Sequence, residues 1–366
     1  MSGEAWNSGA GCEAGAPAAR VTSGADTPFA DYWYIVAESH ELIAGAVLAR
    51  KVLGEWIAVF RDAEGKPAAL RDRCMHRASR LSLGKVSQGC LRCPYHGWLY
   101  RGDGSVAEVP AEGPSQREVA GRRTRRYASR EQDGYVYVRL AEAPAVETEP
   151  FSMPHWGEAG WGRVRLQNRF RNTVTNCVEN FIDVPHTVFV HPGIFRTARG
   201  QPIAATITRE GGVVTVTYAG ETDNLGWFSW FLNPTKAPIV HTDQFFMPNV
   251  THVRYGMGPR RTFLITSQSV PLEDDETLVY TDLSYDYGWF TPLAAPIVRW
   301  QSQAVIDQDI VALGQQMEVI RKYGDAFANT PADLVHVLVE SLRAAIAKGE
   351  DPRALPVRTH AVTFHA

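Results

Sequence analysis

The stretch that decides the fold runs from residue 74 to residue 98 and reads CMHRASRLSLGKVSQGCLRCPYHGW. It contains Cys-x-His, formed by Cys74 and His76, followed by Cys-x2-His, formed by Cys93 and His96. Each motif brings one thiolate and one imidazole to the tip of a loop. Paired loops of this kind hold a two-iron, two-sulfide cluster, with both cysteines on one iron and both histidines on the other. The spacing therefore predicts an iron–sulfur site.

The two ligand types suit one-electron chemistry. Thiolate is soft and negatively charged and binds ferric iron and sulfide well, whereas neutral imidazole lowers the negative charge at the second iron and raises the reduction potential. Gly97 would let backbone N–H groups approach the sulfurs, and Pro94 would stiffen the second loop. A cluster held in this way can pass single electrons.

A zinc site is the alternative, because two cysteines and two histidines also suit tetrahedral zinc. The usual zinc spacings place like ligands together, whereas here each cysteine is paired with a histidine. Cys90 is interpreted as an ordinary buried thiol rather than a spare ligand. Cys12 and Cys177 do not stand at a spacing from other cysteines or histidines that is typical of metal ligands.

Composition excludes several classes of protein. The chain has 366 residues, of which 45% are hydrophobic and 21% charged, which suits about two globular domains. A net charge of -3 supplies no positive field for nucleic acid. The N-terminus lacks the pattern of a secretory signal, and no apolar run is long enough to span a membrane. Because an odd set of five cysteines also fits a reducing compartment, we expect a cytoplasmic protein.

Local patterns divide the chain into a tail and two domains. Residues 1–27 have too little apolar content to fold and are expected to form a flexible tail. A Pro- and Glu-rich segment at 140–154 is typical of a domain linker. We therefore place the first domain at 28–145 and the second at 146–366.

The sequence pattern of the first domain predicts small antiparallel sheets. Trp56–Phe60 and Ala68–Leu70 flank a Gly/Pro turn and predict a hairpin, and Asp133-Gly134 precedes another apolar run. In the second domain, strands are followed by long helices, which indicates the α+β class. The expected elements there are a helix at 172–190, strands at 213–218 and 262–265, and helices at 297–322 and 331–347, the last with Thr330 as N-cap.

A second motif, D-x2-H-x4-H, is formed by Asp183, His186 and His191. Asp183 and His186 would share a helix face, and the Pro-Gly after His191 would end the helix and let its ring swing back. Two histidines and one carboxylate form a facial triad that leaves positions open on ferrous iron. Asp309 and Asp307 are both candidates for the carboxylate, although acidic residues on a helix can also form a solvated face.

Both motifs, their order and their separation resemble the α subunits of Rieske non-haem iron oxygenases, the superfamily of aromatic ring-hydroxylating enzymes and demethylases. The resemblance extends from about residue 28 to residue 347, and Trp33–Ala37 looks like the opening strand of that family. It implies an N-terminal all-β Rieske [2Fe-2S] domain followed by a helix-grip (START-like) catalytic domain. It also favours Asp309 over Asp307 as the third iron ligand, because Gln315-Gln316 follows it.

The same resemblance implies the remaining roles. Four residues would bind the [2Fe-2S] cluster: Cys74, His76, Cys93 and His96. Three residues would bind mononuclear Fe(2+): His186, His191 and Asp309. Asp183 would be a bridging carboxylate that links an iron-bound histidine to a cluster histidine of the adjacent chain in a head-to-tail homotrimer. Such a contact would fix imidazole orientation and offer an electron route.

The activity implied is O2-dependent hydroxylation or oxidative demethylation of a fairly apolar, small organic substrate. Electrons would come from an external NAD(P)H-dependent reductase or a ferredoxin, because the chain has neither a G-x-G-x-x-G loop nor a second cluster motif. The alternatives are a cis-dihydroxylating dioxygenase and, from another class, a Rieske electron carrier with a ligand-binding second domain. An intact D-x2-H-x4-H motif argues against the carrier.

Two further patterns allow a functional and a structural interpretation. Arg117 and the segment Arg122–Arg126 could receive an acidic ferredoxin, or they could form a solvated loop. Aromatic pairs in the second domain could line the substrate cavity or belong to the core: Trp227-Phe228, Trp230-Phe231, Phe245-Phe246 and Trp289-Phe290.

Overall fold

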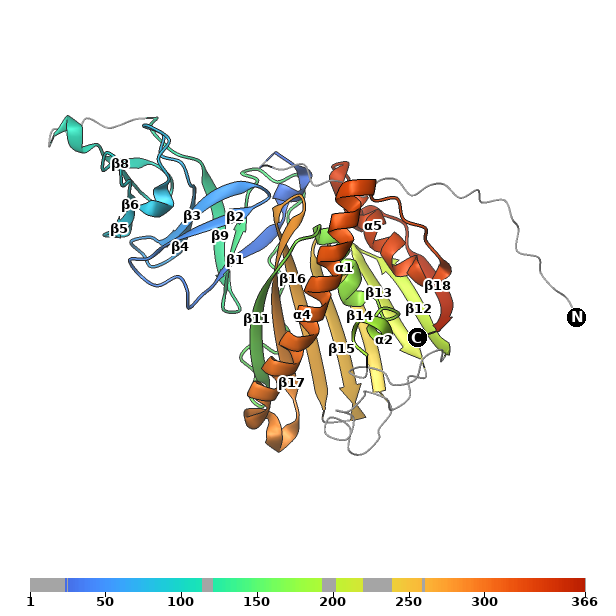
Figure 1. Cartoon of the computed structure of the whole chain (residues 1–366). Coiled ribbons are helices and arrows are strands. Elements are labelled where there is room, and N and C mark those ends of the chain that lie inside the picture. The colour runs from blue at the N-terminus through green and yellow to red at the C-terminus, as the bar shows by residue number, and fades with distance from the viewer. Residues whose placement is uncertain are drawn as a thin grey trace, which may run out of the picture.

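The computed structural model describes residue 24 and residues 26–113, 121–192, 202–219, 239–258 and 261–365. It is an α+β protein in which an N-terminal β domain is followed by a large sheet with helices on one face (Figure 1). Most of the predicted tail, Cys12, Arg117 and the aromatic pairs at 227–231 lie outside the described residues.

The N-terminal domain is built on a six-stranded antiparallel sheet in the order β1-β10-β9-β4-β3-β2. The predicted hairpin is confirmed, because β3 pairs with β4 around a turn at 62–66. A second hairpin turns at Asp133 and Gly134, whose φ angles of 51° and 74° match the right-handed twist of the flanking strands. The strands are β1 Trp33–Glu38, β2 Val47–Val52, β3 Glu55–Arg61, β4 Pro67–Arg71, β9 Arg126–Gln132 and β10 Tyr135–Arg139.

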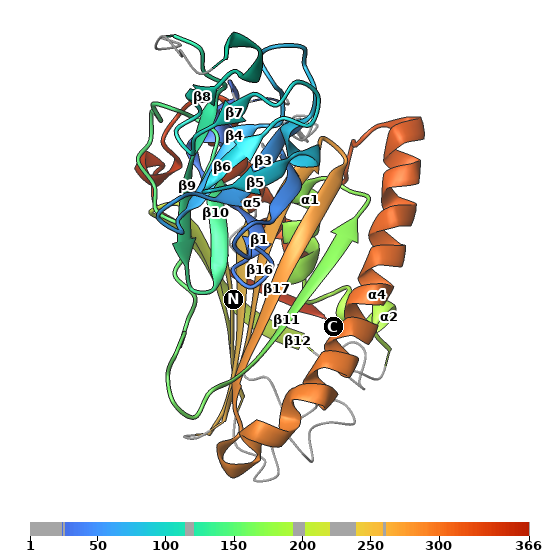
Figure 2. The same cartoon turned by 90° about the vertical axis from the view of Figure 1, so that its left-hand side faces the viewer.

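A separate four-stranded sheet carries the Cys/His loops at the far end of this domain (Figures 1 and 2). One loop follows β4, and the other connects β6 to β7. Buried apolar side chains from both sheets form a single hydrophobic cluster beneath the loops. The strands are β5 Lys85–Ser87, β6 Cys90–Arg92, β7 Leu99–Tyr100 and β8 Val106–Glu108.

The second domain is an eight-stranded antiparallel sheet in the order β11-β17-β16-β15-β14-β13-β12-β18. The helices α1 (Val174–Ile182), α4 (Thr291–Tyr323) and α5 (Leu334–Ala347) cover one face of it (Figure 1). The strands are β11 Gly162–Phe170, β12 Pro202–Glu210, β13 Val213–Ala219, β14 Ile239–Phe246, β15 Val250–Met257, β16 Thr262–Glu273, β17 Glu276–Asp286 and β18 Arg358–His365.

The single helix predicted at 172–190 is wrong. The chain forms α1 and a short α2 (Thr187–Val190), and Asp183 between them has extended backbone angles of φ -88° and ψ 109°. Pro185 is the physical reason, because it lacks the N–H that would donate to the carbonyl of residue 181 in a continuous helix and disfavours helical geometry at Val184. Asp183 and His186 therefore do not share a helix face.

The two C-terminal helices are confirmed with small changes at their starts. α4 begins at Thr291 rather than Ile297, and α5 is preceded by a 3-10 turn at Pro331–Asp333. Thr330 caps that turn and exchanges hydrogen bonds with Asp333 in a capping box. None of the described helices is long and apolar enough to cross a membrane.

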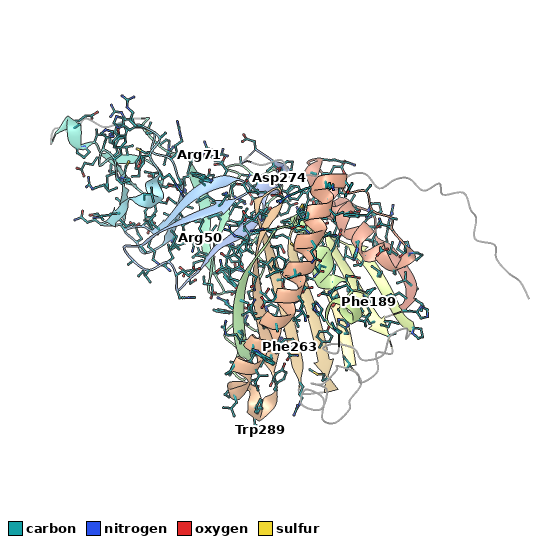
Figure 3. All side chains as sticks on the ribbon, in the orientation of Figure 1. Arg50, Arg71, Phe189, Phe263, Asp274 and Trp289 are labelled. Atoms are coloured by element: carbon teal, nitrogen blue, oxygen red, sulfur yellow. The ribbon has the colours of Figure 1, made fainter. Side chains whose placement is uncertain are left out.

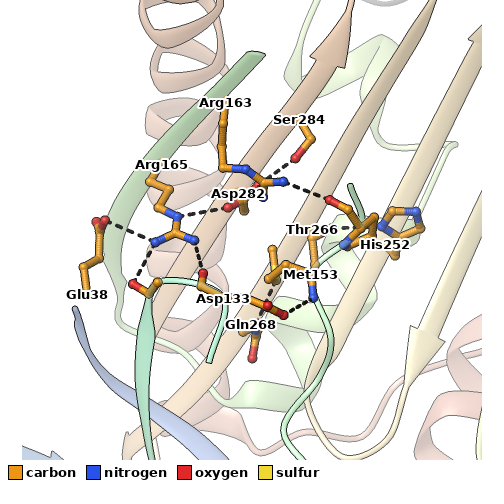
Figure 4. Close-up of polar contacts among 12 residues, drawn as sticks. Glu38, Asp133, Met153, Arg163, Arg165, His252, Thr266, Gln268, Asp282 and Ser284 are labelled. Atoms are coloured by element: carbon orange, nitrogen blue, oxygen red, sulfur yellow. Dashed lines mark hydrogen bonds and ion pairs between the residues drawn. The ribbon is translucent and has the colours of Figure 1, made fainter. Parts of the chain in front are cut away.

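The two domains pack through a shared core and a polar network. The core joins β1 and β10 to Val270, Leu272 and Tyr280 of the large sheet. In the network, the Arg165 guanidinium donates to the carbonyls of residues 133 and 134 in the N-terminal domain and, at 3.0 Å, to Asp282 on β17 (Figure 4). The segment between β10 and β11 contains neither helix nor strand. The boundary at residues 145 and 146 stays a prediction.

Candidate cluster site and metal centre

Two hairpin-like loops bring the four predicted cluster ligands together. The backbone N–H of Ala78 donates to the carbonyl of Cys74 at 2.9 Å, and that of Gly97 donates to the carbonyl of Cys93 at 3.2 Å. Gly97 has a φ of 73°, which glycine adopts without strain. The tight turns leave both thiols buried and free of disulfides.

The two histidines of these loops face each other. The ring centroids of His76 and His96 lie 4.5 Å apart, and Nδ1 of His76 is buried with no hydrogen-bond partner. Trp98 stacks on His76 at 4.9 Å with an interplanar angle of 6° and limits its rotation. Two buried free thiols beside two imidazoles, one with an orphaned nitrogen, fit a cluster with mixed Cys/His ligation.

Tyr100 is a residue of this site that sequence reasoning missed. Its phenol oxygen accepts from the backbone N–H of Met75 at 3.2 Å and lies 3.1 Å from Sγ of Cys74. Burial raises the pKa of Tyr100, so the phenol stays protonated and can donate to the thiolate. Its position four residues after His96, on the strand that follows the second loop, was the available signal.

Cys90 and the basic segment lie near this site. Cys90 starts β6 and is half-buried rather than buried, which corrects the earlier interpretation, although its thiol is free. Arg122 pairs with Glu112 at 2.6 Å and lies over the ring of Trp98 at 5.4 Å. Part of the basic segment therefore adjoins the cluster loops.

The second motif and α4 converge on a metal-type site. His186 and His191 flank the short helix α2, and Asp309 is a buried residue of α4. Oδ1 of Asp309 lies 3.1 Å from Nε2 of His191 and 3.6 Å from Nε2 of His186. One potential ligand atom from each of the three residues lies within 4.8 Å of the others.

The two candidate carboxylates of α4 point in different directions. Asp309 is 5% exposed and faces the histidines. Asp307 is exposed and accepts from Nε2 of Gln303 at 2.8 Å on the outer side of the helix. Residues two apart on a helix differ by about 200° in direction, so only one of them can reach the site.

The charges of the three side chains fit a cation. Burial opposes protonation of His186, but the neighbouring carboxylates of Asp183 and Asp309 outweigh it and raise the pKa of His186 to about 9. Burial likewise opposes ionisation of Asp309, yet the two neighbouring histidines lower its pKa to about 2. Nε2 of His186 and Oδ1 of Asp309 are buried without a hydrogen-bond partner. A divalent cation would satisfy both atoms.

Hydrogen bonds to the outer nitrogens orient both imidazoles. Oδ2 of Asp183 lies 3.2 Å from Nδ1 of His186 and accepts from its backbone N–H. Oε1 of Gln308 lies 2.7 Å from Nδ1 of His191. Such contacts fix the tautomer of a metal-binding histidine. Sequence reasoning missed Gln308, for which adjacency to Asp309 was the one available signal.

A mainly apolar cavity lies against this site. It is bounded by α1, α4 and the inner face of the sheet, and it includes His186, His191 and Asp309 in its lining. Five aromatic residues contribute to its wall: Phe170, Phe181, Tyr255, Phe263 and Tyr287. Buried apolar lining with a few polar groups is typical of a site for a small organic molecule.

The aromatic pairs for which the sequence allowed either a cavity or a core position do not line the cavity where they are described. Phe245 packs in a different hydrophobic cluster, beneath α1 and α5, and Phe246 contacts Phe151. Trp289 is 83% exposed at the lower end of the molecule (Figure 3). Phe245 shares a face of β14 with the cavity residues His241 and Asp243 but lies nearer the end of the strand, whereas alternation turns Phe246 to the opposite face. Trp289 belongs to the short 3-10 turn before α4.

Two family models match the chain. Residues 32–127 match the Rieske [2Fe-2S] domain, and residues 171–348 match the vanillate O-demethylase oxygenase C-terminal domain. The order of these domains is the one that the two motifs predicted. This chain is a homologue of the Rieske oxygenase α subunits.

The curated relatives of this Rieske oxygenase homologue agree with that result. Chlorophyllide a oxygenase of Chlamydomonas reinhardtii is 33% identical over 47% of this chain and 26% of that protein. Methylxanthine N1-demethylase NdmA of Pseudomonas putida is 31% identical over 52% of each chain. The chain spans about half the length of the bacterial relatives it matches, and less of chlorophyllide a oxygenase.

Solved structures share the fold over nearly the whole chain. NdmA of Pseudomonas putida CBB5 with caffeine has a TM-score of 0.75 at 22% identity, covering 89% of this chain and 94% of that chain. Dicamba monooxygenase bound to dicamba has a TM-score of 0.73 at 20% identity, covering 88% and 98%. The Rieske oxygenase homologue therefore has a Rieske β domain followed by the catalytic fold of that family.

Proposed function

We propose that this chain is the oxygenase component of a multicomponent Rieske system that hydroxylates or oxidatively demethylates a fairly apolar organic substrate. The observation that carries the proposal is the convergence of His186, His191 and Asp309 on a mainly apolar cavity, in one chain with the Cys/His loops. An electron carrier would need the loops but would have no use for three converging ligands beside a cavity.

The proposed ligands follow from the contacts above. Cys74, His76, Cys93 and His96 would hold the [2Fe-2S] cluster, and His186, His191 and Asp309 would hold Fe(2+) on one face. When bound, these centres would supply electron transfer and O2 chemistry. Asp183 and Gln308 would orient the two iron-binding imidazoles. The aromatic wall of the cavity would position the substrate and exclude water.

The net reaction inserts one oxygen atom of O2 into a C–H bond of the substrate. The other oxygen atom leaves as water, formed with two electrons from the reductase and two protons. Hydroxylation of an O- or N-methyl group gives an unstable product that releases formaldehyde, which is demethylation. Relatives described as an N1-demethylase, an N-alkylformylase and a toluene-4-sulfonate monooxygenase favour this reaction over dihydroxylation.

We also propose a head-to-tail homotrimer. Within one chain, the four-stranded sheet that carries the cluster loops lies at the end of the molecule opposite α2 (Figures 1 and 2). Electron transfer falls steeply with distance, so a neighbouring chain would have to bring its cluster to the iron. Asp183 would then be the bridging carboxylate, supported by its contact with His186 and by Nε2 of His336 at 3.8 Å from Oδ1.

The electron donor would be an external NAD(P)H-dependent reductase or a ferredoxin in the cytoplasm. Arg122 and its basic neighbours adjoin the cluster loops through Trp98, so an acidic donor protein could be steered to this end of the molecule. High salt should then slow reduction of the cluster.

The test is the metal and sulfide content of anaerobically purified protein, with EPR of its dithionite-reduced form. We expect about three irons and two sulfides per chain and a signal of mixed Cys/His ligation. Light scattering should give the mass of a trimer. Zinc without sulfide would overturn the cluster assignment. An iron content of two per chain that does not rise to three when ferrous ion is added would favour the electron carrier.

A further inference from the structure

Three hydroxyl side chains form a row across the sheet side of the cavity. Thr251 on β15 lies directly opposite Ser267 on β16, and Ser267 lies directly opposite Thr281 on β17, three neighbouring strands of the large sheet (Figure 1). Side chains that lie opposite one another in this way are about 5 Å apart. All three residues line the cavity and are 1%, 3% and 4% exposed. We refer to them as the hydroxyl row.

The hydroxyl row has hydrogen-bonding capacity that the fold does not use. Oγ of Ser267 lies 3.3 Å from Oγ1 of Thr281, so one of these hydroxyls can donate to the other, and the second donor stays available. The hydroxyl of Thr251 has no hydrogen-bond partner among the residues that the structure describes. Two O–H groups on the cavity wall are therefore available to a ligand.

Stability alone does not explain the hydroxyl row. A buried hydroxyl without a partner costs free energy, and valine has a similar shape and an equal preference for strands. The two positions that flank the row on the outer strands are apolar, with Phe245 opposite Thr251 and Leu166 opposite Thr281. The next cavity-lining row on the same three strands is also apolar: Val253, Ile265 and Leu283. The hydroxyls are thus a local polar feature of an apolar wall.

The hydroxyl row and the metal-type site lie toward the same end of the cavity. Helix α4 follows β17 after a short turn and runs back along the sheet (Figure 1). Ala294, near the start of α4, shares a hydrophobic cluster with Tyr287, and both line the cavity. Asp309 lies about 22 Å further along the helix, at 1.5 Å per residue. The lining contributed by β17 and its end likewise runs from Tyr287 back to Thr281.

The charges of the lining favour a neutral ligand. Its ionisable side chains are three carboxylates and three imidazoles: Asp183, Asp243 and Asp309, and His186, His191 and His241. No lysine or arginine belongs to the part of the lining that the structure describes. An ionised substrate carboxylate would lose its hydration there without gaining a permanently charged side chain as partner. A neutral carbonyl oxygen costs less to bury and can accept two hydrogen bonds.

We propose that the hydroxyl row binds a neutral carbonyl oxygen of the substrate. The substrate would be a largely apolar molecule with a ketone, amide or ester group close to the carbon that is oxidised. Thr251 and one of the other two hydroxyls would donate to the carbonyl oxygen, and the carbon to be oxidised would face Asp309 and its two histidines. The apolar remainder would extend toward the aromatic side chains at the other end of the cavity. This inference rests on the proposed function of the same cavity.

A matched pair of compounds tests the hydroxyl row by binding alone. Isothermal titration of the anaerobic holoenzyme would compare 2-methoxyacetophenone with 1-ethyl-2-methoxybenzene, which has the same skeleton but lacks the carbonyl oxygen. We expect the ketone to bind about tenfold more tightly, the combined effect of two neutral hydrogen bonds. The ionised carboxylate of 2-methoxybenzoate should make that compound bind at least about tenfold more weakly than the ketone.

Thr251→Val removes one donor and keeps the shape of the side chain. It breaks no hydrogen bond within the described part of the chain. We expect the preference for the ketone to fall to about threefold, with the affinity for 1-ethyl-2-methoxybenzene unchanged within about twofold. Thr266→Val is the matched control, because Thr266 is also buried in the sheet but contacts His252 and lies outside the cavity lining. This control should keep the tenfold preference.

A triple variant removes the whole row. Thr251→Val, Ser267→Ala and Thr281→Val together should abolish the preference for the ketone. Thr251→Val alone decides the question if the triple variant loses its far-UV circular dichroism or its cluster EPR signal.

The outcomes separate the hydroxyl row from the proposed function. A preference that survives unchanged in Thr251→Val overturns the row, as does a wild-type protein that binds neither compound, shows no preference, or binds 2-methoxybenzoate as tightly as the ketone. Bound compounds that are oxygenated while Thr251→Val binds them like the wild type reject the row alone. A preference that depends on Thr251, without oxygenation of either compound when electrons and O2 are supplied, supports the row and rejects the oxygenase.

Discussion

Oδ1 of Asp309 lies 3.1 Å from Nε2 of His191, although one residue belongs to the long helix α4 and the other ends the short helix α2. The contact joins two elements that are distant in the sequence. Nε2 of His186 lies 3.6 Å from the same oxygen, so three potential ligand atoms surround one position that a divalent cation can occupy.

Loss of this carboxylate should remove the mononuclear iron and leave the cluster in place. We expect the iron content of Asp309→Ala to fall from about three to about two per chain, with an unchanged cluster EPR signal. Its O2-dependent turnover should fall more than about 100-fold. Asp307→Ala is the matched control, because Asp307 is exposed on the same helix. Equal iron loss in both variants would contradict the assignment.

Metal affinity should depend on pH through His186. Its pKa in the metal-free protein is raised to about 9, because the carboxylates of Asp183 and Asp309 outweigh the opposing effect of burial. Below that pKa a proton competes with the metal, so the apparent Kd for Co²⁺ should rise about tenfold per unit as pH falls from 8 to 6. The dependence should level off only near pH 9.

Co²⁺ binding followed by its d–d absorption would measure this effect. Asp183→Asn removes one of the groups that raise the pKa of His186, so the plateau should begin at a lower pH in that variant. An affinity that is constant above pH 7 in the wild type would show that His186 titrates like an ordinary histidine, near 6.5.

Asp183→Asn should separate iron binding from turnover. An amide of the same size can still contact His186 but loses the negative charge that orients and polarises the imidazole. We expect both centres to remain bound while turnover falls about 10- to 100-fold. Stopped-flow spectroscopy of the reduced cluster in the presence of O2 and substrate should show slower reoxidation. Turnover equal to that of the wild type would contradict the proposed bridging role of Asp183.

Tyr100 should tune the reduction potential of the cluster. A hydrogen bond to a ligand sulfur stabilises the more negative, reduced state, and the phenol lies 3.1 Å from Sγ of Cys74. Tyr100→Phe should lower the midpoint potential by about 20 to 60 mV, which corresponds to ~0.5–1.5 kcal/mol for one hydrogen bond. Protein-film voltammetry would measure it. Tyr127→Phe is the control, because the hydroxyl of Tyr127 binds Glu55 in the same domain. This variant should leave the midpoint potential unchanged.

Asp282 should stabilise the contact between the domains. Its carboxylate is buried and pairs with Arg163 and Arg165, and Arg165 in turn holds two carbonyls of the N-terminal domain (Figure 4). Asp282→Ala leaves two largely buried guanidinium groups without their carboxylate, so we expect a loss of about 3 kcal/mol or more. Urea unfolding followed by tryptophan fluorescence would measure it.

The exposed pair of Asp275 and Arg321 provides the comparison. Their side chains are 42% and 54% exposed, so Asp275→Ala should change the free energy of unfolding by less than about 1 kcal/mol. Similar losses in Asp275→Ala and Asp282→Ala would mean that burial does not strengthen the inner pair.

The sequence by itself identified the candidate ligands of both sites and much of the local structure. Cys74 with His76 and Cys93 with His96 are pairs within single loops, so spacing alone brought their ligand atoms together. The hairpin of β3 and β4 and the capped 3-10 turn before α5 also follow from turn and capping residues. The signal for the helix break was present too, because Pro185 stands between Asp183 and His186.

Only the tertiary structure decided which distant residues meet. Asp307 and Asp309 are equivalent by local pattern, and the packing of α4 alone turns Asp309 toward the histidines. The placement of Tyr100 beside Cys74 and the choice of cavity aromatics likewise depend on how separate elements pack. Local periodicity encodes which side of an element is apolar, but contacts between distant residues arise from the joint packing of sheets and helices.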